Sequence, residues 1–170
     1  MGIYPGALIA CAYYREPSIG KFISLGWVVG FAFDTLFRNA GPYFSLFLRH
    51  TGAVSVWTVF PLYLQGLGAI GFRIGFIYAI NPGIQFLVMR RLDSFRDERL
   101  ILAGYLLSCS GFVSYFFALP YLYIIPGMFF IAFSWAFLYV GSTRLVIEQN
   151  LEKATAAGLI NSMIGAAGVF

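Results

Sequence analysis

The sequence contains few charged residues. Asp, Glu, Lys and Arg make up 11% of its 170 residues, whereas a soluble domain carries about 25%. Hydrophobic residues make up 60% and aromatic residues 19%, and the mean hydropathy is +0.81. The 11 basic and 7 acidic side chains are too few to cover a soluble core of this size. Composition therefore excludes a soluble enzyme and a disordered chain, and it predicts an all-α protein embedded in a lipid bilayer.

The sequence also lacks a set of residues for catalysis or metal binding. It has one His and two Cys, and Cys11 and Cys109 stand 98 residues apart, each in an apolar stretch. That setting favours packing roles over a disulfide. No Asp or Glu lies within an expected full membrane span, so acid–base chemistry has no candidate residues. We expect no enzyme, no metal site and no organic cofactor.

Long uncharged runs locate the expected membrane helices. Residues 100–143 form 44 consecutive uncharged residues, and residues 51–72 form another 22. Because one span takes about 20 residues, we expect four full transmembrane helices, at about 42–64, 72–89, 100–119 and 121–141. Residues 158–170 form a shorter apolar segment of 13 residues, which reaches about 20 Å as a helix and spans only part of the bilayer.

Basic residues lie between the apolar runs and set the expected orientation. Segment 90–99 holds four Arg, and Arg144 and Lys153 follow the last long run, whereas segment 65–71 holds none. The positive-inside rule places the basic segments in the cytoplasm. We therefore expect a multi-pass protein of the cell membrane, and the net charge of +4 does not indicate nucleic-acid binding.

One motif matches the fingerprint of dinucleotide-binding proteins. Residues 66–71 read Gly-Leu-Gly-Ala-Ile-Gly, a literal GxGxxG, with Asp93 downstream. A dinucleotide site needs a strand before this motif and an amphipathic helix after it. Pro61 argues against a central strand, and the residues that follow the motif offer no charged face. We interpret the glycines as an extracellular turn between two membrane helices.

Arg49 and His50 lie inside the first expected span. A cation at that position is about 10 Å below the surface by helix rise, and it costs about 2 kcal/mol or more if it faces lipid. Two interpretations remain open. Arg49 either faces a cavity, where it contacts substrate or takes part in gating, or it snorkels to the cytoplasmic interface.

Further polar and aromatic residues fall on the other expected spans. Asn81 and Gln85 share a face of 72–89, and their amides need partners at that depth. They either contact substrate or bond to a neighbouring helix. Trp135 is placed to stack on a ligand, although aromatic residues near helix ends are often interface anchors. Together with Arg49 and His50, these residues form the expected substrate cavity.

Helix 100–119 carries a row of small residues with a structural interpretation. Gly104, Ser108 and Gly111, followed by Tyr115, recur on one face. Small residues in such a row let two membrane helices approach closely. We expect this ridge to pack against another helix.

The segment between the second and third expected spans mixes both signs of charge. It contains Asp93, Arg96 and Arg99 among other charged residues. Ion pairs between the ends of adjacent helices lock one conformation and release another, so these three residues are candidates for a cytoplasmic gate. The alternative is a solvated loop with weak surface pairs.

With these elements in place, residues 43–170 resemble the second half of a transporter of the major facilitator superfamily. The resemblance rests on residues 48–52, 60–64, 71–82, the segment around Asp93, residues 134–141 and residues 153–158. Asp93 fits the acid of the family's G-x-x-x-D-R-x-G-R-R loop. Met89, Ser94 and Arg96 depart from that loop at its first glycine, its Arg and its second glycine.

Residues 15–33 resemble a helix near the end of the family's first half. Ser24 to Gly30 and Ser162 to Gly168 share the spacing Ser-x5-Gly, as expected of repeated halves. Only residues 34–41 then separate this segment from the second half, so one family helix is missing. We expect residues 1–41 to be a remnant of first-half helices and residues 42–170 a partial second-half bundle, left by an internal deletion and the loss of both ends.

The resemblance implies secondary transport of a small solute by alternating access, with doubtful activity of the chain alone. Its partners would be the bilayer, an unknown solute, and either a missing transporter half or a second copy of the chain. The alternative is a small membrane scaffold that binds a partner protein and transports nothing.

Overall fold

The structure is a computed structural model that describes residue 30 and residues 32–169. Within this part of the chain it contains helices and turns but no strand, which confirms the all-α prediction. The helices are α3 (Ala40–Gly66), α4 (Gly71–Met89), α5 (Asp97–Phe116), the 3-10 turn η1 (Tyr121–Tyr123), α6 (Ile124–Gln149) and α7 (Lys153–Ala167). A helical stretch at 32–38 precedes α3. The expected first-half remnant at 1–41 falls largely outside the described residues.

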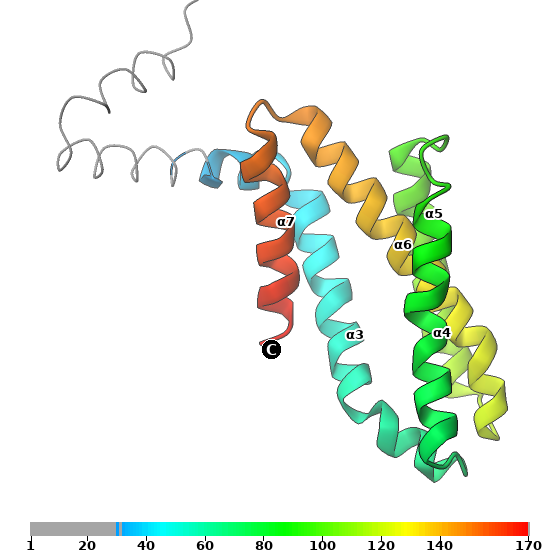
Figure 1. The fold of residues 1–170 in the computed structure, drawn as a ribbon. Helices are drawn as coiled ribbons and strands as arrows, with labels where there is room; N and C mark the ends of the chain where they lie inside the picture. Colours follow the sequence, from blue (N-terminus) through cyan, green and yellow to red (C-terminus); the bar gives the residue numbers. More distant parts are fainter. Residues whose placement is uncertain (1–29, 31, 170) are drawn as a thin grey trace, which may run out of the picture.

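Successive helices run in opposite directions along one bundle (Figure 1). Helix α6 lies at its centre and contacts α3, α4, α5 and α7. Helix α7 lies beside the first part of α3, and α4 and α5 pack on α6 (Figure 1). Toward its C-terminal end α3 bends (Figure 1), in the part that contains Pro61, as expected where proline removes a helix hydrogen bond.

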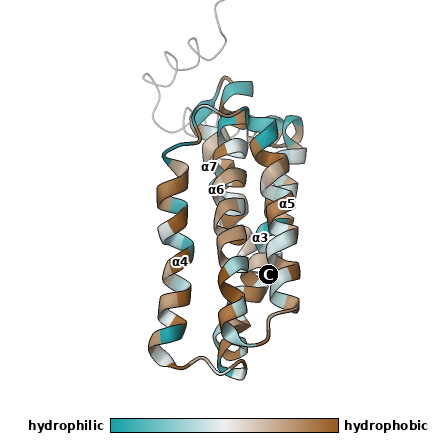
Figure 2. Cartoon of the chain, turned by 90° about the vertical axis from the view of Figure 1, so that its right-hand side faces the viewer, coloured by the Kyte–Doolittle hydropathy of each residue, from teal (hydrophilic) through white to brown (hydrophobic). Residues whose placement is uncertain are grey.

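Three helices are long and apolar enough to cross a membrane: α4, α5, and η1 with α6 (Tyr121–Gln149). Hydrophilic residues gather at one end of the bundle, at the α4–α5 and α6–α7 connections, while the helices are mainly apolar (Figure 2). Helix α3 has 27 residues, but it carries Arg49 and His50 and is not among these three. These three helices coincide with three of the four expected spans, and the count of four is not confirmed.

The helix bounds differ from the sequence prediction where charged residues begin or end a helix. Helix α4 starts at Gly71 against an expected 72, whereas α6 continues to Gln149, eight residues beyond the expected end at 141. Helix α5 begins at Asp97, because Asp97 and Glu98 in its first turn complement the helix dipole. Charged residues that we expected in loops thus extend the helices beyond their apolar segments.

Glycines hold α5 and α6 in close contact. The row Gly104, Ser108, Gly111 and Tyr115 is buried, which confirms the expected packing ridge. A Cβ atom at Gly104 would lie 2.6 Å from Cγ of Leu138, and one at Gly111 would lie 2.7 Å from Cδ1 of Ile131. No side chain fits at these distances, so the α5–α6 contact depends on glycine.

The GxGxxG segment is a turn between two helices. Gly66 ends α3, Gly71 begins α4, and Gly68 has a φ of +86°, a conformation that favours glycine. A helix stands where a dinucleotide site would need a strand. The prediction of a glycine-rich turn between helices is confirmed, and the nucleotide-binding interpretation is excluded.

Candidate polar site between α3, α5 and α6

Arg49 reaches across the bundle from α3 to two serines. Its Nε atom donates to Oγ of Ser108 on α5 at 3.0 Å, and its Nη2 atom donates to Oγ of Ser134 on α6 at 3.3 Å. The two serine hydroxyls, both buried, are also hydrogen-bonded to each other. The side chain therefore lies between helices and does not turn toward the helix end as snorkelling requires.

Aromatic rings enclose the other side of the guanidinium. The Cζ atom of Arg49 lies 5.2 Å from the centre of the Trp135 ring, close enough for a cation–π interaction. The centroid of the His50 ring lies 4.8 Å from that of Trp135, and Tyr139 stacks on Trp135 at 5.8 Å. Three of the five residues predicted for the cavity, Arg49, His50 and Trp135, are thus brought together.

Two polar atoms beside this group are buried without a hydrogen-bond partner in the described part of the chain. They are Nδ1 of His50 and the hydroxyl oxygen of Tyr105. Tyr105 packs on the same apolar cluster as Trp135. Because buried polar groups are nearly always paired, these two atoms are exceptions in this part of the bundle.

Asn81 and Gln85, the other two predicted cavity residues, lie elsewhere. The Nε2 atom of Gln85 donates to Oδ1 of Asn81, one turn away on α4. Asn81 also lines a separate cavity of about 500 Å³ with Trp57 and Tyr78. Within the described residues, neither amide contacts the Arg49 group.

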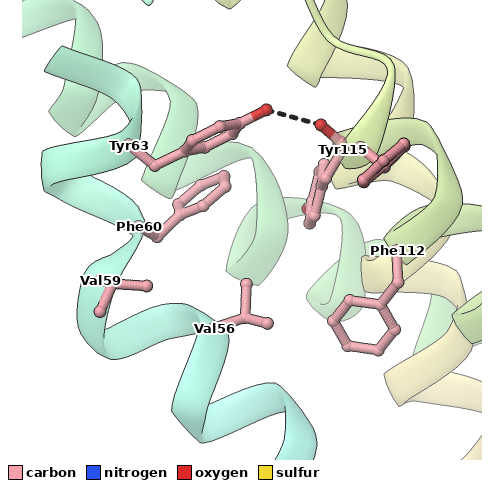
Figure 3. Close-up of a pocket in the computed structure, with 7 residues that line it drawn as sticks. Val56, Val59, Phe60, Tyr63, Phe112 and Tyr115 are labelled. Carbon is pink, nitrogen blue, oxygen red and sulfur yellow. Dashed lines mark hydrogen bonds between the residues drawn. The ribbon is translucent and has the colours of Figure 1, made fainter. Parts of the chain in front are cut away.

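An apolar pocket of about 400 Å³ lies between α3 and α5 (Figure 3). Its lining consists of aliphatic and aromatic side chains, namely Val56, Val59, Phe60, Tyr63, Phe112, Tyr115 and Phe116. The Tyr63 hydroxyl donates to the backbone oxygen of Tyr115 at 2.6 Å (Figure 3), and the Tyr115 hydroxyl donates to the sulfur of Met128 at 3.0 Å. Both hydroxyls are therefore engaged, and the pocket offers a ligand mainly apolar surface.

At the hydrophilic end of the bundle, Arg144 and Asp97 form an ion pair that the sequence does not predict. Nη2 of Arg144, on α6, lies 2.9 Å from Oδ1 of Asp97 at the start of α5. Arg144 also donates to the backbone oxygens of Leu92 and Phe95, each at 3.1 Å. One side chain thus fastens the α4–α5 connection to α6.

The three predicted gate residues are exposed. Arg96 lies 3.7 Å from Glu98, with both side chains largely in solvent. Asp93 and Arg99 form no ion pair within the described residues. The less exposed ionic contact of this region is therefore the one between Asp97 and Arg144, and the predicted residues lie around it.

Sequence reasoning missed the partners of Arg49 and Arg144. From the sequence, Ser108 has only a packing interpretation, and Arg144 is expected in a loop after 141. A search for small hydroxyl residues on the expected faces of the other helices would have found Ser108 and Ser134 as possible partners for a partly buried cation.

Within the described residues there is no group of three or more metal-ligating side chains.

No known protein family, no curated protein and no solved structure matches the chain.

Proposed function

We propose that the chain is a membrane-embedded unit of a facilitator-type secondary transporter, and that its solute binds at Arg49. In this proposal α3 is a fourth span, since its 27 residues extend about 40 Å as a helix, more than the bilayer core of about 30 Å. The basic connections at the hydrophilic end of the bundle face the cytoplasm of a cell membrane.

The observation that carries this proposal is the set of neutral partners around Arg49. Its contacts in the described residues are Ser108, Ser134 and Trp135, with no carboxylate among the ion pairs. A cation that served only to join helices would be stabilised most by an acid. An uncompensated cation inside a bundle is typical of a substrate pathway.

The Asp97–Arg144 pair supplies the second part of the mechanism. It joins the start of α5 and the α4–α5 connection to α6 at the cytoplasmic end. Breaking this pair frees that end to open, and remaking it closes the end, as alternating access requires. A second copy of the chain completes the cavity on the open side of α3.

Helix α4 favours the alternative of a scaffold without transport. Its one buried residue is Ile77, and Phe72, Phe76 and Phe86 are exposed. Such a face binds either lipid or a partner helix. A scaffold without transport is therefore the second candidate function, and the transport experiment below distinguishes the two.

The experiment reconstitutes the purified chain in proteoliposomes and adds a cell extract labelled uniformly with carbon-13. Mass spectrometry then identifies labelled solutes in the lumen. We expect at least one solute to enter with the wild type and not with Arg49→Gln. Arg73→Gln, which removes an exposed cation of α4, serves as the matched control and retains uptake. No uptake, together with stable association with another membrane protein, would favour the scaffold.

A further inference from the structure

The Arg49 group and the apolar pocket follow one another along α3 and α5. Arg49 and Val56 are seven residues apart on α3, about 10 Å along the helix axis. Ser108 and Phe112 are four residues apart on α5, about 6 Å along its axis. Because Arg49 bonds Ser108 while Val56 and Phe112 line the pocket (Figure 3), the polar group lies next along the two helices, beyond the lining of the pocket.

The polar end is rich in unused hydrogen-bond donors. A guanidinium has five N–H groups, and Arg49 uses its Nε and Nη2 atoms on the two serines. The Tyr105 hydroxyl, which is buried without a partner in the described residues, is a further donor. A carboxylate accepts several hydrogen bonds at once, and it is the group whose geometry a guanidinium fits best.

The number of charges limits the ligand to a monoanion. Arg49 is the charged residue of α3, and the other charged residues of α4 to α7 lie near helix ends: Arg73 at the start of α4, Asp97 to Arg99 at the start of α5, Arg144 and Glu148 near the end of α6, and Lys153 at the start of α7. One negative charge neutralises Arg49, whereas a dianion such as phosphate would leave a net charge in an apolar surrounding.

From this juxtaposition we infer that the site binds a monocarboxylate with an apolar body, the carboxylate at Arg49 and the body in the pocket between α3 and α5. The pocket volume of about 400 Å³ lies in the range of small-molecule sites. The inference rests on the proposed function, because it names the chemical class of the solute.

Fluorine-19 NMR of the chain in lipid nanodiscs tests this inference with two probes of one shape. The first is 4-(trifluoromethyl)phenylacetate, and the second is the neutral 4-(trifluoromethyl)phenylacetamide. We expect the acid to bind saturably and about tenfold or more tightly than the amide, since hydrogen bonds to charged groups give differences of that order. Equal affinity for acid and amide, or saturable binding of neither, would overturn the inference.

Three variants separate the two ends of the site. Arg49→Gln abolishes the preference for the acid, and Val56→Phe, which fills the pocket, weakens acid and amide alike. Arg73→Gln is the matched control and leaves both affinities unchanged; an equal loss in this variant would show attraction to any surface cation and refute the site. Val56→Phe keeps Arg49 and its serine contacts, so it tests the pocket even where Arg49→Gln impairs folding.

The binding and uptake experiments fail independently. Saturable acid binding lost in Arg49→Gln, without entry of any labelled solute, supports the ligand class and contradicts transport. Uptake that depends on Arg49, without preference for the acid, supports transport and contradicts the ligand class.

Discussion

Nη2 of Arg144 lies 2.9 Å from Oδ1 of Asp97, and the Asp97 side chain is 8% exposed. The same guanidinium binds two backbone oxygens of the α4–α5 connection. Removing it leaves a buried carboxylate and two carbonyls without their partner. This contact is therefore the main polar link at the hydrophilic end of the bundle.

Arg144→Gln should lower the free energy of unfolding by about 2–3 kcal/mol, because a nearly buried acid loses its counter-ion. Arg96→Gln removes an arginine whose Nε atom lies 3.7 Å from Oε2 of Glu98 in an exposed pair. This variant should change the free energy of unfolding by less than about 1 kcal/mol. Unfolding of both variants by sodium dodecyl sulfate in mixed micelles, followed by circular dichroism, measures the difference. Equal effects would show that Arg144 contributes only surface charge.

Gly104→Ala should destabilise the bundle by about 1–3 kcal/mol, as overpacking does. The added Cβ would lie 2.6 Å from Cγ of Leu138 and 3.1 Å from its backbone nitrogen, so the Leu138 side chain or one of the helices must shift. Gly83→Ala is the matched control, because nothing lies within 4 Å of a Cβ at that position. The same unfolding assay should find Gly83→Ala unchanged or slightly more stable; a neutral Gly104→Ala would refute the close α5–α6 contact.

Tyr43→Phe should loosen α7. The Tyr43 hydroxyl is buried and donates to the backbone oxygen of Ala156 at 3.1 Å, so its loss costs about 1 kcal/mol and speeds amide hydrogen exchange in α7. Tyr105→Phe removes a buried hydroxyl that has no partner in the described residues and should leave exchange unchanged. Equal exchange in the two variants would contradict the α3–α7 contact.

Single cysteines should report two sides of the membrane. In a variant with Cys11 and Cys109 replaced by serine, Ser94→Cys and Leu151→Cys lie at exposed positions of the two connections at the hydrophilic end, and both should react with an impermeant maleimide in inside-out vesicles. Leu67→Cys, in the α3–α4 turn, should react in right-side-out cells instead. Labelling of all three from one side would exclude α3 as a fourth span.

Much of the fold could be predicted from the distribution of charge. Helix α4 agrees with the prediction to one residue, because a glycine turn precedes it and Arg90 follows. The ends of α5, α6 and α7 could not be predicted in this way, since Asp97, Arg144 and Lys153 lie within helices. An uncharged run measures the apolar segment, and a helix continues past it wherever dipole and ion-pair interactions stabilise the added turns.

The candidate site was predictable only in part. Arg49 and His50 stand out because a cation in an apolar helix is costly. Their contacts with Trp135 and Ser134 depend on how α3 crosses α6, and a single sequence does not define a crossing. Asn81 and Gln85 have the same polarity, but they satisfy each other within α4. A side-chain pair within one helix and a pair between helices give the same sequence signal.

Uptake of labelled solutes by proteoliposomes with Arg49→Gln and Arg73→Gln tests the central claim most directly. The account predicts that Arg49→Gln lowers the initial rate by about tenfold or more, since truncating one side of a buried charged contact weakens binding at least that much, while Arg73→Gln matches the wild type. Equal uptake by both variants, or none by the wild type, would contradict the assignment of Arg49 as the solute-binding residue.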